Sequence, residues 1–132
     1  MKDDITLNPF TMSLDLDNDC IVKKGEPIPF NVIEIDKLDE ITYDQDKNHF
    51  QIHQPGDYYI SYQMKTEKRY HMDIQGNISY FEADIFPVEK ISHGSGIMTA
   101  SCENATFYIT CMNHDIFFLK GKQATITIFR VR

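Results

Sequence analysis

Apolar and polar residues alternate in several short runs, and the clearest run follows a Pro-Gly turn at residues 55–56. Along residues 57–64, alternate positions are occupied by the large apolar or aromatic side chains of Tyr58, Ile60, Tyr62 and Met64. A period of two residues places such a set on one face of a strand. The pattern therefore predicts a half-buried strand that begins at a tight turn.

Similar alternation predicts further strands on both sides of this run. The first covers residues 10–16, and the last covers residues 123–131. Pro29 makes residues 28–32 an edge strand or a strand with a bulge. Gly76-Asn77 predicts a hairpin-like turn, and the sequence His-Gly-Ser-Gly at residues 93–96 predicts a flexible loop. We expect about ten short strands, no helix, and a single antiparallel sandwich or barrel domain over residues 1–132.

Two of the predicted strands have little charge on either face. In the last strand, the positions between the buried apolar ones are occupied by Thr125, Thr127, Phe129 and Val131. In the strand of residues 57–64, Tyr59 stands on the side that should face solvent. A sheet that is apolar on both faces needs a partner beyond its own core. Surface tyrosine and threonine tolerated in an ordinary strand would produce the same pattern.

The charge of the chain narrows the classes of partner. A formal net charge of −7 argues against binding to nucleic acid or to an anionic membrane surface. No apolar run approaches the roughly 20 residues of a membrane-spanning helix, and residues 1–4 do not resemble the start of a signal peptide. We therefore expect neither membrane insertion nor a nucleic-acid partner. Cys20, Cys102 and Cys111 are too few for a disulfide framework, and the sequence leaves a pairing of the last two open.

Three motifs, in this order, resemble a known family. They are Gly-Glu-Pro-Ile-Pro-Phe-Asn (25–31), Phe-Gln-Ile (50–52) followed by Gly-Asp-Tyr-Tyr-Ile-Ser-Tyr (56–62), and Ala-Thr-Ile-Thr-Ile-Phe-Arg (124–130). The sequence from about residue 25 to 132 resembles the globular domains of the tumour necrosis factor (TNF) and complement component 1q proteins. Within that superfamily it is most similar to the C-terminal heads of the Bacillus collagen-like proteins of the spore surface (exosporium).

The resemblance implies a ten-stranded jelly roll of two sheets that assembles as a homotrimer. By position, it places five residues in the core or in the trimer interface: Tyr58, Tyr59, Tyr62, Ile128 and Phe129. It also implies a location on the spore or cell surface. The chain departs from the spore-surface proteins because it has no Gly-X-Y collagen repeat. It also has Glu-Asn before residue 105, where those proteins usually have a Gly-Asp turn.

Four acidic residues are weak candidates for a metal site. Asp15, Asp17, Asp19 and Glu26 have the spacing of a calcium-binding loop. However, Cys20 stands where that loop needs glycine, and the flanking residues have the period of a strand. A solvated turn is the expected structure, so calcium is the only cofactor we consider, and we expect no cofactor.

The histidines do not have the spacing of a metalloenzyme. His49 and His53 would lie on one face of a strand but about 13 Å apart, too far for one metal ion. The closely spaced histidines and following glutamate of a cupin are absent from the sequence. The sequence around Ser95 also lacks the first glycine and the following helix of a nucleophile elbow.

The sequence therefore favours a non-enzymatic, homotrimeric structural or recognition module. It would bind a protein or a carbohydrate through surface loops, for which the candidates are residues 36–40, 44–48, 65–69 and 89–96. Two alternatives remain open at this stage. One is a small cupin-like, metal-dependent jelly-roll enzyme, and the other is the trimeric head of a phage fibre or capsid.

Overall fold

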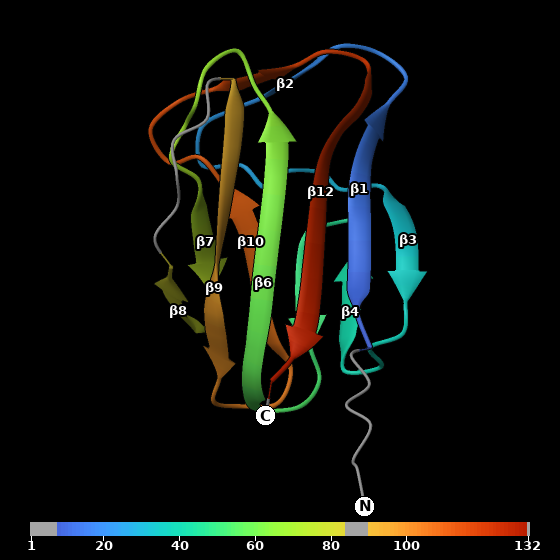
Figure 1. The fold of residues 1–132 in the computed structure, drawn as a ribbon, viewed down its shortest axis with the longest axis vertical. Helices are drawn as coiled ribbons and strands as arrows, with labels where there is room; N and C mark the ends of the chain where they lie inside the picture. Colours follow the sequence, from blue (N-terminus) through green and yellow to red (C-terminus); the bar gives the residue numbers. More distant parts are fainter. Residues whose placement is uncertain (1–7, 84–89, 132) are drawn as a thin grey trace, which may run out of the picture.

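The computed structural model describes residues 8–83 and 90–131, and these residues form β-strands without any helix. The strands pack as two layers, and the larger layer faces the viewer in Figure 1. This larger sheet has six antiparallel strands in the order β3 (Val32–Asp36), β1 (Phe10–Leu16), β12 (Gly121–Arg130), β6 (Gly56–Lys65), β9 (Ile91–Ala100) and β8 (Ser79–Glu82). The strand predicted after the Pro-Gly turn is β6, one of the two central strands of this sheet.

The second layer is a four-stranded antiparallel sheet behind the first. Its order is β4 (Ile41–Asp44), β5 (His49–Ile52), β10 (Ala105–Thr110) and β7 (Asp73–Gly76). The two sheets together contain ten strands among the described residues, and the chain passes repeatedly from one sheet to the other. The fold is the all-β jelly-roll sandwich that the sequence predicted.

A two-stranded ribbon closes one end of the sandwich. It consists of β2 (Cys20–Val22) and β11 (Ile116–Phe118), and it lies at the end opposite the labelled termini (Figure 1). Val22, Ile116 and Phe118 are buried beneath the ribbon. Ile21 and Phe117, which are paired with each other, point the other way, and Ile21 is 56% exposed. The ribbon therefore covers the core and presents apolar side chains outward.

The core between the sheets is aromatic at its centre. Phe50 of β5 is fully buried and contacts four other rings, with centroid separations of 4.7 to 6.3 Å; these belong to Phe10, Phe30, Tyr43 and Phe107. Offset and edge-to-face contacts of this kind add stability beyond the burial of area. The alternation in β6 and β12 supplies the neighbouring core residues, as the period of two residues predicted.

The predicted flexible loop at residues 93–96 is wrong, because this segment lies in the middle of β9. Both of its glycines are buried where aromatic side chains cross the strand. A Cβ atom at Gly94 would lie 2.6 Å from the Tyr62 hydroxyl, and one at Gly96 would lie 2.9 Å from the Tyr80 ring. Glycine within a strand can mark such a close approach rather than a loop.

Candidate functional site

The outer face of the six-stranded sheet carries a row of apolar side chains that crosses four strands. The register pairs Phe81 with Ile97, Ile97 with Tyr59, and Tyr59 with Phe129. Phe81 is 79% exposed, and the Tyr59 and Phe129 rings stack with their centroids 6.1 Å apart. We call these four residues the apolar row. They lie on the face that points away from the core.

A second row beside the first carries hydroxyl groups. The register aligns Ser95, Ser61, Thr127 and Thr11 across β9, β6, β12 and β1. The hydroxyls of Thr11 and Thr127 hydrogen-bond to each other at 3.2 Å. We call these four residues the hydroxyl row. Neither row contains a charged residue, which leaves the centre of this face neutral in a chain with a net charge of −7.

A pair of charged groups lies at one margin of this face, where β3 bulges. Glu34 is the additional residue at a bulge in β3, and its carboxylate accepts a hydrogen bond from the buried Ser13 hydroxyl at 2.7 Å. The Lys122 ammonium lies 3.1 Å from the same carboxylate oxygen. The Ser13 hydrogen bond, followed by Lys122, lowers the pKa of Glu34 below its ordinary value.

The C-terminal end of β12 is held by an arginine that contacts three separate groups. The Arg130 guanidinium lies 2.9 Å from the Glu40 carboxylate and donates to the Gln54 side chain and the Pro55 carbonyl, also at 2.9 Å. Arg130 also lies over the Tyr58 ring, 5.8 Å from its centroid. A guanidinium suits this role because its planar fork of donors can satisfy several acceptors at once.

The five residues that the resemblance placed in the core or the interface divide into two groups. Tyr58, Tyr62 and Ile128 are buried, with exposed fractions of 0%, 3% and 0%. Tyr59 and Phe129 are half-buried and belong to the apolar row. The sequence did not indicate Phe81 or Ile97. Tyr80 and Phe81 are consecutive aromatic residues, which a strand places on opposite faces, and this is a signal that could have found the row.

The acidic candidates for calcium do not come together as a metal site. The Asp19 carboxylate accepts the Lys120 backbone N–H at 2.9 Å, and the Glu26 carboxylate accepts the Lys23 backbone N–H at 3.1 Å. Asp15 and Asp17 are exposed. Within residues 8–83 and 90–131, no three His, Cys, Asp or Glu side chains are placed to hold a metal ion. The Asp19 and Glu26 carboxylates act as acceptors for backbone N–H groups in turns and loops.

The histidines and cysteines have separate structural environments. His49 stacks on Tyr108 with ring centroids 4.6 Å apart, and a His53 ring nitrogen lies 2.7 Å from the Thr42 hydroxyl. Cys111 is buried and Cys102 is exposed, and both are free thiols.

A polar hollow of about 240 Å³ lies between β7 and β8, at one edge of the sandwich. It is lined in part by His71, Asp73, Tyr80 and Glu82. The Tyr62 hydroxyl donates to Glu82 at 3.3 Å, and burial raises the pKa of both Tyr62 and Tyr80. The Tyr80 hydroxyl is buried without a protein partner among the described residues. A bound water would satisfy this group.

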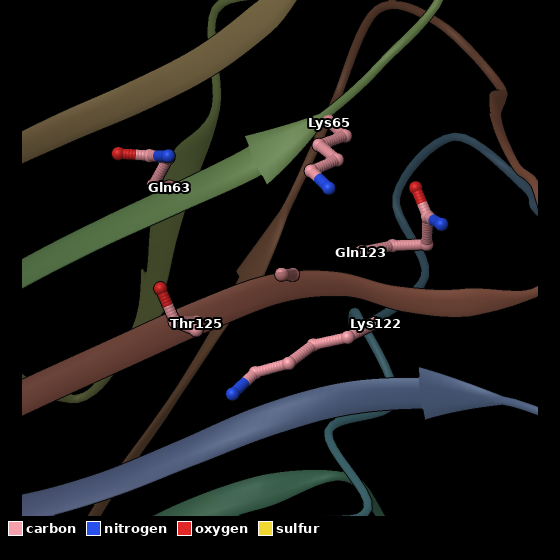
Figure 2. Close-up of a pocket in the computed structure, with 6 residues that line it drawn as sticks. Gln63, Lys65, Lys122, Gln123 and Thr125 are labelled. Carbon is pink, nitrogen blue, oxygen red and sulfur yellow. The ribbon is translucent and has the colours of Figure 1, made fainter.

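Two adjoining hollows lie near the end of the sandwich that the ribbon closes. The smaller, about 190 Å³, lies over β6 and β12 on the outer face, and Figure 2 shows the Lys65 ammonium directed towards β12 and Lys122 extending beside β1. The larger, about 730 Å³, is the apical hollow; it is lined by Lys65, Thr66, Glu67, Lys90, Phe117, Leu119 and Gln123. Lys65 and Gln123 line both hollows and therefore stand between them.

Comparison with solved structures establishes the class of fold. The chain superposes on the Eiger TNF of S. frugiperda with a TM-score of 0.60 at 12% identity, over 97% of this chain and 94% of that one. It superposes on the globular domain of the zebrafish complement 1qA protein with a TM-score of 0.57 at 14% identity, over 96% and 98% of the two chains. The chain has a TNF/complement-1q-like fold.

A third solved structure has the same likeness of fold. The PRD1 vertex protein P5 matches with a TM-score of 0.59 at 11% identity, over 97% of this TNF/complement-1q-like chain and 100% of that one. No protein-family model matches the sequence, and no curated protein matches it. None of the described residues forms a helix long and apolar enough to cross a membrane. At these identities the likeness establishes the architecture alone.

Proposed function

We propose that this chain is a non-enzymatic recognition head that assembles as a homotrimer through the outer face of its six-stranded sheet. The observation that carries the proposal is the apolar row beside the hydroxyl row. Phe81 is 79% exposed and Ile97 is 37% exposed, on a face where eight aligned residues carry no charge. A neutral apolar patch of this kind is typical of an interface between protein chains.

The geometry of the patch favours a closed ring. Phe81 lies on β8, at the edge of the sheet, whereas Tyr59 and Phe129 lie on the central strands β6 and β12. An edge that packs against the face of the next copy makes a heterologous contact, and such a contact gives a ring when the rotation between copies closes. The resemblance to the TNF and complement-1q globular domains favours a ring of three. Three copies would multiply weak contacts with a ligand through avidity.

The test is the absolute mass in solution, measured by light scattering after size-exclusion chromatography. We expect a mass near three times 15.4 kDa for the unaltered protein. Tyr59→Glu places a charge in the apolar row and is expected to shift the protein to the monomer, because burying an unpaired carboxylate is unfavourable. Gln51→Glu adds the same charge to the four-stranded sheet and should leave the mass unchanged. A monomeric unaltered protein would contradict the proposal.

A phage-fibre or capsid head is the second candidate function. The likeness to the PRD1 vertex protein P5 supports it, since the whole of that chain is covered. Both candidates use the same trimer, so the genes beside this one distinguish them: structural genes of a virion would favour the second. A location on the spore or cell surface is part of the first proposal and rests on the sequence motifs.

The cupin-like enzyme has less support than either candidate. Such an enzyme needs convergent histidines and a carboxylate around a metal ion. In the described part of the chain, His49 and His53 instead contact Tyr108 and Thr42. Elemental analysis of the purified protein distinguishes the classes, because one equivalent of a transition metal would favour the enzyme.

A further inference from the structure

The apical hollow is built by segments that are distant in the sequence. One wall is the end of β6 and the residues after it, with Lys65, Thr66 and Glu67. The facing wall is formed by Phe117 of β11 and Leu119, which follows it. Because all of these residues belong to a single copy of the chain, the hollow does not depend on assembly.

Two lysines line this hollow, Lys65 at the end of β6 and Lys90 directly before β9. Lys65 is opposite Ile91 in the register of β6 and β9, and the Thr66 backbone N–H donates to the Lys90 carbonyl at 3.1 Å. Lys65 and Lys90 are exposed, and within residues 8–83 and 90–131 neither has a carboxylate within ion-pair distance. Among the described residues that line the hollow, Lys65, Lys90 and Glu67 carry two positive charges and one negative charge, a net of +1, whereas the whole chain has −7. The hollow is therefore a local site for an anionic group.

The facing wall is apolar. Leu119 is 59% exposed, and Phe117 points outward from the ribbon beside Ile21, which is 56% exposed. A flat apolar surface next to ammonium groups suits a ligand that has both a carboxylate and a ring with an apolar face. A free inorganic anion would contact only the lysines and not the apolar wall.

Two acceptors at the same hollow distinguish a sugar from other organic acids. The Gln123 side-chain amide donates its N–H to the Lys120 carbonyl at 3.0 Å, which leaves its oxygen as an acceptor. Glu67 supplies a carboxylate, which accepts hydrogen bonds and repels anions. Acceptors next to lysines match hydroxyl groups carried on the same molecule as a carboxylate.

We infer that the apical hollow binds an acidic saccharide, a sugar ring of the hexuronic acid type. Its carboxylate contacts Lys65 and Lys90, and the apolar face of the ring lies on Phe117 and Leu119. Its hydroxyl groups donate to Gln123 and Glu67. The inference rests on the proposed role as a recognition head and gives that role a class of ligand.

The test is a titration followed by NMR of the Leu119 methyl groups, with glucuronic acid, glucose and acetate as separate probes. We expect glucuronic acid to shift these methyl signals saturably, at concentrations where glucose and acetate do not. Lys65→Gln should raise the dissociation constant about tenfold, the usual effect of losing one charge-assisted hydrogen bond. Lys47→Gln removes the same charge from an exposed turn between β4 and β5 and should change nothing.

A second substitution tests the contribution of the apolar wall. Leu119→Ala should weaken glucuronic acid binding several-fold, measured through the aromatic NMR signals of Phe117. Met112→Ala removes a side chain that is 46% exposed outside the hollow and should leave the binding unchanged. Equal shifts with acetate would reduce the site to simple charge attraction and overturn the inference. Equal shifts with glucose, or no shift with any probe, would also overturn it.

The two proposals fail separately. If the mass is that of a monomer but glucuronic acid binds, the trimer is wrong and the site is retained. If the mass is that of a trimer and no probe shifts the Leu119 signals, the saccharide site is wrong and the assembly is retained.

Discussion

Two glycines of β9 leave room for large aromatic side chains of this protein to cross the strand. Gly94 and Gly96 of β9 leave the space through which Tyr62 and Tyr80 pass across the sheet. Tyr62 thereby reaches Glu82 on β8, two strands away from its own. The glycines are therefore packing residues, although their sequence looks like that of a loop.

Gly96→Ala tests this packing. The added Cβ would lie 2.2 Å from the Phe81 carbonyl oxygen, and a backbone atom cannot move aside as a side chain can. We expect a loss of about 2 kcal/mol in the free energy of unfolding, measured by urea denaturation. Ser101→Ala, at the exposed residue that follows β9, should change it by less than about 0.5 kcal/mol. Similar losses for both variants would contradict this account.

Glu34 provides a test of electrostatics at the same scale. Because its pKa is lowered in the folded protein, its interactions stabilise the fold above the ordinary carboxyl pKa of 4.5 and are lost as the pH falls through the folded-state value. Ser13→Ala removes the largest cause of the shift. We expect the pKa of Glu34 to rise towards 4.5 in an NMR titration, and Ser61→Ala, on the same face, to leave it unchanged.

At the scale of elements, most strands were predictable and several connections were not. Gly76-Asn77 resembles a hairpin turn, yet β7 and β8 belong to different sheets. The Asn77 side-chain oxygen accepts the Thr106 backbone N–H at 2.7 Å, and the Asn77 N–H donates to the Thr106 carbonyl at 3.1 Å. Asn77 thus continues the pairing with β10 beyond the strand, while the chain turns away to the other sheet.

Proline explains the expected edge strand that did not form at residues 28–32. Ile28 and Phe30 alternate with Pro27 and Pro29, and both are buried, as an edge strand would require. Proline has no N–H to donate to a ladder, so only isolated backbone bonds remain, such as Ile28 N–H to the Ile109 carbonyl at 2.8 Å. The strand β3 begins at Val32, beyond Pro29.

Hydrogen exchange distinguishes a strand from a loop at residues 93–96. In β9, these residues pair with β6 throughout, and Gly96 also pairs with Glu82 of β8. Paired amides in a strand with neighbours on both sides exchange slowly, since exchange requires local opening. We expect the Gly96 amide to exchange at least about a hundredfold more slowly than amides in the turn of residues 45–47. Comparable exchange rates for the Gly96 amide and the turn amides would contradict the strand and favour the predicted loop.

At the scale of the whole molecule, the outer face of the six-stranded sheet carries an apolar row that is not part of the core. The inward sides of β6 and β12 meet the four-stranded sheet, while the apolar row lies on the outward side, where Phe81 is 79% exposed and Ile97 is 37% exposed. Burying such a row in an assembly removes apolar area from water and makes folding depend on association.

The midpoint of thermal unfolding should therefore depend on protein concentration. We expect it to rise by several degrees over a hundredfold range of concentration, because mass action favours the assembled native state. Tyr59→Glu should abolish this dependence, and Gln51→Glu should preserve it. A midpoint that is independent of concentration for the unaltered protein would contradict assembly coupled to folding.

The fold class could be predicted from the sequence because a strand's alternation is a local property. Tyr58, Ile60, Tyr62 and Met64 all lie in the core, as their spacing requires, whichever strands neighbour them. The apolar row could not be predicted in this way. Phe81, Ile97, Tyr59 and Phe129 become neighbours only through the register of the four strands β8, β9, β6 and β12.

The apical hollow also arises from long-range pairing of strands. Lys65, Lys90 and Leu119 belong to segments with no shared motif, and they meet because β6 pairs with β9 and the ribbon folds over the end of the sandwich. Local pattern determines which face of a strand is buried. Long-range pairing determines which residues share a surface, and the surface carries the chemistry.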